Sequence, residues 1–261
     1  MYEETAVVEE PSQAVMDVRP GDARFSTRFG WLDSSHSFSF GHHYDPHNTH
    51  FGLLLVSNDD VVAPGTGFET HPHRDMEIVT WVLEGALVHQ DSMGHNGVIY
   101  PGLAQRMSAG TGILHSEKND DWTLTGASEH DRPVHFVQMW VVPDESAVTP
   151  GYEQLDVTAQ LGAGGLVTVA SGMPSHRGDA AIRIRNRYAA LHAARLGAGD
   201  SVELPVSPFA HLYVARGSIE LEVVGRLGTG DAARVTHAQG QRVVASDDAE
   251  ILVWEMHATV R

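Results

Sequence analysis

From about residue 24 onward the chain is a succession of short apolar runs, each about five to eight residues long and each followed by Gly, Pro, Asn or Asp. Clear examples are residues 51–56, 77–83 and 135–142, which are rich in Val, Ile and aromatic residues. Runs of this length between close turn residues predict β-strands. No long stretch repeats with the 3.6-residue period of a helix, and the best helical candidate is short, Thr158 to Leu161. The chain is therefore predicted to be all-β.

Charge and composition exclude several classes of partner. The formal net charge is −17, so phosphate backbones and anionic membrane surfaces repel the chain, and we expect no direct nucleic-acid or membrane partner. There is no cysteine, which leaves histidines and carboxylates to bind any metal ion and favours a cytoplasmic location. The longest apolar runs are too short to cross a bilayer, and the first residues lack the features of a signal peptide.

The chain is long enough, at 261 residues, for one large domain or two ordinary ones. Residues 1–18 are acidic with little apolar periodicity, and we expect a mobile tail there. A polar stretch with two prolines and a glycine, residues 143–151, is typical of a linker. We therefore predict an N-terminal domain over 19–147 and a C-terminal domain over 148–261.

Two short motifs carry the chemistry, His71-Pro72-His73 and His115-Ser116-Glu117. In each, two potential metal ligands stand at positions i and i+2, which lie on the same face of a β-strand. On neighbouring strands the two motifs could direct three imidazoles and one carboxylate to a single point, a donor set that suits a divalent transition metal. With 17 histidines the spacings alone could arise by accident, so their context must support the prediction.

A faint internal repeat indicates two related halves. Residues 81–89 and 213–221 both read aromatic, Val, two residues, Gly and then aliphatic residues that alternate, which predicts a strand, a tight turn and a strand. At this offset of 132 residues, the positions opposite His71, His73 and His115 are Glu203, Pro205 and Asp247. If the halves are duplicates, only the first kept a metal site.

Several longer segments, in order along the chain, resemble the pirin family of the cupin superfamily, and in particular its bacterial branch of pirin-like quercetin 2,3-dioxygenases. The segments are Trp31-Leu32, His36–Phe40, Tyr44–Pro46, Gly67–Ile78, Leu83–Gly85, His89–Gly94 and Met107–Glu117. The match is strong over about residues 24–143 and weaker beyond.

The resemblance implies a bicupin, with two antiparallel, jelly-roll-like β-barrel domains and one metal site in the N-terminal domain. The family's ligands match His71, His73, His115 and Glu117. The metal most often discussed for the family is iron, here expected as iron(II), while copper, nickel, cobalt, manganese and zinc also suit these ligands.

The resemblance also implies a metal-dependent dioxygenase that cleaves the ring of a flavonol such as quercetin with O2, releasing carbon monoxide and a depside. Glu117 is the expected catalytic base for the 3-hydroxyl proton. Two alternatives stay open: a metal-binding regulatory protein with a protein partner, and a cupin that acts on an unidentified metabolite.

Two further sets of residues near the motifs carry predictions, Glu77 and the histidines that precede the first motif. Glu77 has the same strand parity as His71 and His73, so we expect it to be buried near the site, orienting a ligand imidazole, or else to act as a cap or surface group. Of the five histidines between residues 36 and 50, His36 is the best candidate to line a pocket, and the others are expected in solvated loops.

Overall fold

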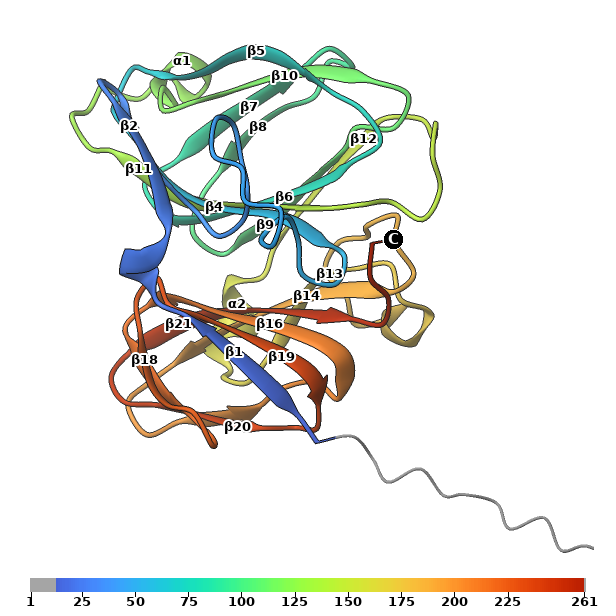
Figure 1. Ribbon diagram of the computed structural model, residues 1–261. Coiled ribbons are helices and arrows are strands. Elements are labelled where there is room, and N and C mark those ends of the chain that lie inside the picture. Colours follow the sequence, from blue (N-terminus) through green and yellow to red (C-terminus); the bar gives the residue numbers. More distant parts are fainter. Residues whose placement is uncertain (1–12, 261) are drawn as a thin grey trace, which may run out of the picture.

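The computed structural model describes residues 13–260 and consists of two stacked barrels, each built from a large and a small antiparallel sheet (Figure 1). The predicted all-β bicupin fold is confirmed. The predicted strands at 77–83 and 135–142 are present, and the short predicted helix is α2 (Thr158–Gly162). The predicted strand at 51–56 starts later, at Leu54, because Phe51 closes a turn back onto that residue.

The N-terminal barrel has a seven-stranded sheet and a four-stranded sheet. In spatial order, the large sheet contains β12 (Gly151–Asp156), β9 (Leu103–Ser108), β6 (Glu77–Glu84), β11 (Val134–Val141), β4 (Leu54–Val62), β3 (Leu32–His36) and β2 (Phe25–Phe29). The small sheet contains β5 (Gly67–His73), β10 (Ile113–Lys118), β7 (Leu87–Asp91) and β8 (Asn96–Ile99). A one-turn helix, α1 (Trp122–Thr125), follows β10.

The C-terminal barrel repeats this plan with a six-stranded and a four-stranded sheet. The large sheet contains β1 (Val15–Arg19), β19 (Ala232–Ala238), β16 (Ser207–Arg216), β21 (Ala249–Met256), β14 (Ala189–Leu196) and β13 (Val167–Ser171). The small sheet contains β15 (Ser201–Glu203), β20 (Arg242–Ala245), β17 (Ser218–Leu221) and β18 (Gly225–Gly228). Two 3-10 turns, η1 (Gly21–Ala23) and η2 (Pro174–His176), lie in connections.

Each barrel includes one strand from the other half of the chain. β1 pairs with β19 of the C-terminal barrel, and β12 pairs with β9 of the N-terminal barrel. The expected mobile tail over residues 1–18 is therefore wrong for residues 15–18. These residues form a strand because they pair with the open edge of β19. Residues 1–12 lie outside the described part of the chain. The expected domain boundary between residues 147 and 148 assigns β12 to the C-terminal domain, although β12 pairs with β9 of the N-terminal barrel.

The two large sheets pack face to face (Figure 1). A shared apolar core lies between them. Trp81 and Met139 come from the N-terminal barrel, and Tyr213 and Trp254 from the C-terminal one. The indole nitrogen of Trp81 donates to Glu250 at 2.7 Å, and that of Trp254 points at the Met139 sulfur at 3.2 Å. Side chains alternate between the two faces of a strand, so the neighbours of these residues along each strand point into the barrels.

The internal repeat corresponds to equivalent hairpins. β6 leads through Gly85 into β7, and β16 leads through Gly217 into β17. Both glycines have positive φ, 77° and 74°, the backbone conformation that these tight turns require. Among the described residues, no helix is long and apolar enough to cross a membrane.

Candidate metal centre

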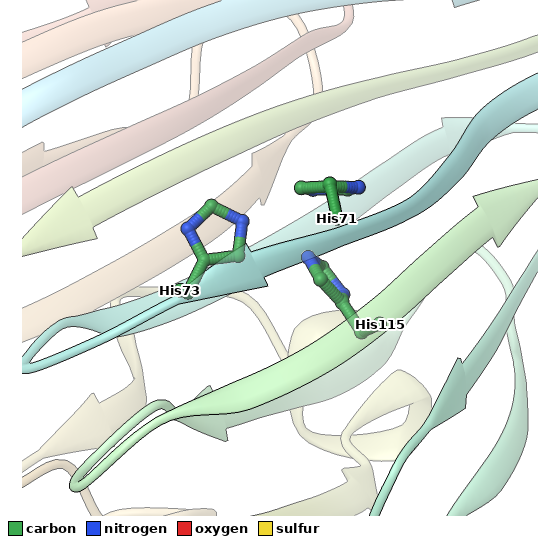
Figure 2. Close-up of side chains that lie close together, drawn as sticks. All are labelled: His71, His73 and His115. Carbon is green, nitrogen blue, oxygen red and sulfur yellow. The ribbon is translucent and has the colours of Figure 1, made fainter.

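The pairing of β5 with β10 brings the two predicted motifs together. His115 lies directly opposite His71 in the antiparallel register, and Ile113 lies opposite His73. Figure 2 shows the two imidazoles of β5 and the imidazole of His115 on the neighbouring strand turned toward one another. The His71 and His115 ring centroids are 4.4 Å apart, and both lie 4.9 Å from that of His73. One nitrogen from each ring lies within 4.8 Å of the other two, so the three could share one metal ion.

Two of these imidazoles each have a buried nitrogen whose burial is unfavourable unless a cation binds it. The Nε2 atoms of His73 and His115 are buried and have no hydrogen-bond partner. Burial and the neighbouring histidines lower the pKa of His73 to about 4 and that of His115 to about 3. Both rings are therefore neutral at pH 7, with a lone pair available, which is the state that binds a metal ion. These residues fit a transition metal.

Backbone and side-chain groups orient the rings from behind. His71 Nδ1 lies 2.7 Å from the Glu69 carbonyl oxygen, an arrangement that keeps its Nε2 free for a metal. His115 Nδ1 lies 3.4 Å from Nδ1 of His89, whose other ring nitrogen is 3.3 Å from an Asp91 oxygen. His89 and Asp91, which lie in one of the segments that resemble the pirin family, therefore support His115.

Glu117 lies beside His115 and is almost fully buried. Its carboxylate forms a second close group with His89 and His115, and His115 is the residue that both groups share. Gln138 Nε2 donates to both Glu117 oxygens at 2.8 Å, and Thr80 donates to Oε1 at 3.5 Å. β10 is regular against β7, so His115 and Glu117 face the same way, as predicted, while the extra residue of a bulge lies on β5.

Gly67, at the start of β5, permits the close approach of β5 to β10. Its φ is 156°, and a Cβ atom there would overlap the carbonyl oxygen of Glu117. Only glycine fits a position where two backbones come this close. The glycine that precedes the first motif therefore sets the distance between the two ligand-bearing strands.

A cavity of about 730 Å³ opens onto His71, His73 and Glu117, while His115 is not among its lining residues. Its walls are largely aromatic, and all its lining residues lie between Thr27 and Trp140, within the N-terminal barrel. The aromatic lining residues are Phe29, Trp31, Phe40, Phe68 and Trp140. His36 lines the cavity too, as the sequence indicated. A volume of this size suits a small organic molecule.

Asp60 and Gln138 are the residues of this site that sequence reasoning missed. Asp60 lies on β4 and lines the cavity, and its buried Oδ1 has no hydrogen-bond partner. Burial raises the pKa of Asp60 to about 7, and the negative charges of Asp59 and Glu117 contribute smaller increases. A hydrogen bond from Ser34 opposes the shift. The available signal was a pair of acidic residues in a strand whose two ends are apolar.

Glu77 is buried, but it does not orient a ligand. Its Oε2 accepts hydrogen bonds from Ser108 at 2.8 Å and from the backbone nitrogen of Arg185 at 3.0 Å. Burial raises the pKa of Glu77. It joins the N-terminal barrel to the connection between β13 and β14, and it is not among the cavity-lining residues.

Comparison with known proteins places the chain in a family. A model described as Pirin matches residues 18–141, and one described as quercetinase C-terminal cupin domain matches residues 167–256. A Mycobacterium tuberculosis protein named "Putative quercetin 2,3-dioxygenase" is 56% identical over 94% of this chain and 96% of its own length. The chain belongs to the pirin family. An Escherichia coli pirin relative, named quercetin 2,3-dioxygenase, is 36% identical over 92% of this chain and 97% of its own length.

The similarity extends to solved pirin structures. The crystal structure of the bacterial pirin YhhW from Escherichia coli, in complex with nickel(II), has a TM-score of 0.80 and 32% identity to this chain. The match covers 94% of this chain and all of that one. The nickel in that relative, together with the cluster of histidines and Glu117 described above, supports a divalent metal in this pirin.

Proposed function

We propose that this pirin is a metal-dependent dioxygenase that cleaves the ring of a flavonol-like substrate with O2. The observation that carries the proposal is the aromatic cavity that opens onto His71 and His73, two of the three converging histidines. The names of the relatives point to the same reaction. His71, His73, His115 and Glu117 would hold one divalent ion, expected to be iron(II).

Three neutral imidazoles and one carboxylate leave a divalent metal a net charge of about +1 with positions open for ligands. When bound, the metal would acidify and polarise a substrate hydroxyl and supply a redox partner for O2. The other tasks belong to the protein. The aromatic walls would stack on a planar substrate and exclude water, and Trp140 contacts the His73 ring at a centroid distance of 4.8 Å.

Proton transfer is assigned to Glu117, which faces the cavity and can accept the proton of a substrate hydroxyl. Gln138 holds both of its oxygens, so the carboxylate is oriented before substrate arrives. Trp140 Nε1 in turn donates to Gln138 Oε1 at 3.0 Å, which fixes the amide. The carboxyl of Asp60, with a pKa of about 7, is a second group in the cavity that can hold or release a proton.

The test is oxygen uptake by metal-loaded protein in the presence of quercetin and a panel of other flavonols. We expect uptake well above that of the free metal, and its loss in His73→Ala. His47→Ala, in an exposed loop away from the cavity, is the matched control and should retain activity. No turnover above free metal in metal-replete protein would exclude the dioxygenase. The regulatory alternative and a cytoplasmic location stay predictions.

A further inference from the structure

A second cluster of potential metal ligands lies in the C-terminal barrel, the half from which the sequence predicted no site. His176, His192 and Glu255 each place one donor atom within 4.8 Å of the other two. His176 ends η2, His192 lies on β14 and Glu255 on β21. The three are far apart in the sequence and form no recognisable spacing motif.

Strand alternation places this cluster at the end of the barrel interior. Ala194 and Leu196 of β14, and Ile251 and Val253 of β21, belong to the inner apolar core of the C-terminal barrel. His192 and Glu255 continue these inward-facing rows by one step each. β14 pairs with β21 in the large sheet of this barrel (Figure 1), and η2 lies in the connection between β13 and β14.

The donor atoms lie close to the separations that a metal ion requires. Glu255 Oε2 lies 2.9 Å from His192 Nε2 and 4.0 Å from His176 Nε2. Ligands held about 2.0–2.2 Å from a tetrahedral zinc ion lie about 3.3–3.6 Å from each other. The two distances fall on either side of this range, so shifts of a few tenths of an ångström would suffice.

Each of the three side chains is also oriented by a hydrogen-bond partner on the atom that faces away from the proposed metal, as metal ligands usually are. His192 Nδ1 lies 3.2 Å from the Thr168 hydroxyl, and His176 Nδ1 lies 3.1 Å from the Ser171 hydroxyl, so both rings turn Nε2 to the carboxylate. His257 Nε2 lies 2.8 Å from the other oxygen, Oε1, which leaves Oε2 for the two ligand rings.

The local charge also suits a cation. Glu255 supplies a carboxylate whose Oε2 faces both His192 Nε2 and His176 Nε2. The side chains of His192 and Glu255 are only 7% and 10% exposed, while that of His176 is 20% exposed. Solvent therefore reaches the cluster from the His176 side, where a water molecule could complete a tetrahedral shell.

We propose that His176, His192 and Glu255 form a second metal site that binds Zn²⁺ with a water molecule as the fourth ligand. His257 is a positioning residue that holds the Glu255 carboxylate. The site lies outside the cavity of the N-terminal barrel and does not depend on the proposed dioxygenase activity.

The experiment measures Zn²⁺ binding to the full-length protein by calorimetry, with bound metal quantified after dialysis. The parent variant is His71→Ala/His73→Ala, which removes two ligands of the first centre. We expect it to retain one Zn²⁺ per chain. Adding His176→Ala should weaken this binding at least tenfold and abolish the visible absorption of tetrahedral Co²⁺ bound in place of zinc.

His176→Gln, which keeps a polar side chain near Ser171, provides a second variant should the alanine variant fail to fold, and it should lose the same ion. Adding His47→Ala to the parent is the matched control for removal of one histidine, and it should leave the affinity unchanged. The proposal is overturned if the parent binds no Zn²⁺, or if the folded His176 variants bind it as tightly as the parent.

Discussion

At the residue scale, this pirin surrounds its candidate metal ligands with groups that hold them in place before any ion binds. Gln138 fixes Glu117, the Glu69 carbonyl fixes His71, and His89 supports His115. The sequence identified the four ligand candidates but not Gln138 or Asp60. These two lie on strands across the barrel, and only the closure of the sheets brings them to the site.

Replacing Gln138 by leucine should weaken metal binding by about 10- to 100-fold, because the Glu117 carboxylate loses its hydrogen bonds and its orientation. Competition with a chromophoric chelator measures the change. Gln90→Leu, at an exposed position of β7, is the matched control. Equal affinities in the two variants would show that Gln138 does not position Glu117.

Asp60→Asn should make the metal-free protein less sensitive to pH. The pKa of Asp60 is about 7 in the folded state and about 3.9 in an unfolded chain, so the wild type loses stability as pH rises through this window. The loss amounts to at most about 4 kcal/mol above pH 7, and it is absent below pH 4. Urea unfolding at pH 4, 6 and 8 measures it. A stability difference between variant and wild type that does not change with pH would contradict this assignment.

At the element scale, the site depends on the pairing of β5 with β10. The period of two in their sequences predicted the shared face of each ligand pair. The bulge on β5 was not predictable, because a bulge arises from how two strands meet and not from either sequence alone. The same holds for β1, whose pairing with β19 depends on an open edge more than 200 residues away in the chain.

Gly67→Ala should force β5 away from β10, because the added Cβ atom meets the Glu117 carbonyl. We expect a loss of about 2–4 kcal/mol in unfolding free energy and weaker metal binding. Gly94→Ala is the control: that glycine also has positive φ, but nothing lies within 4 Å of its Cβ position. If both variants lose the same stability and keep the metal, backbone strain alone explains the effect.

At the scale of the whole molecule, the two barrels share one apolar core and exchange one strand each. The sequence predicted two halves and a metal site in the first. It did not predict the exchange, or the cluster of His176, His192 and Glu255, because both arise from contacts between distant segments. The shared core implies that the halves unfold together.

Trp254→Ala should therefore destabilise the whole molecule and not the C-terminal barrel alone. Its indole is buried between the sheets beside Met139, and truncation of such a side chain costs about 3–5 kcal/mol. Differential scanning calorimetry should show one transition, shifted to lower temperature. Two transitions, of which only one moves, would mean that the barrels unfold independently.

We propose above that His71, His73, His115 and Glu117 hold one divalent ion at the end of the aromatic cavity. Anomalous diffraction from crystals of nickel-loaded protein, collected on both sides of the nickel edge, tests it directly. We expect a peak about 2.0–2.3 Å from a nitrogen of each histidine and from a Glu117 oxygen. A peak away from these residues would contradict the proposal. So would a metal ion that Glu117 does not coordinate because its carboxylate stays hydrogen-bonded to Gln138.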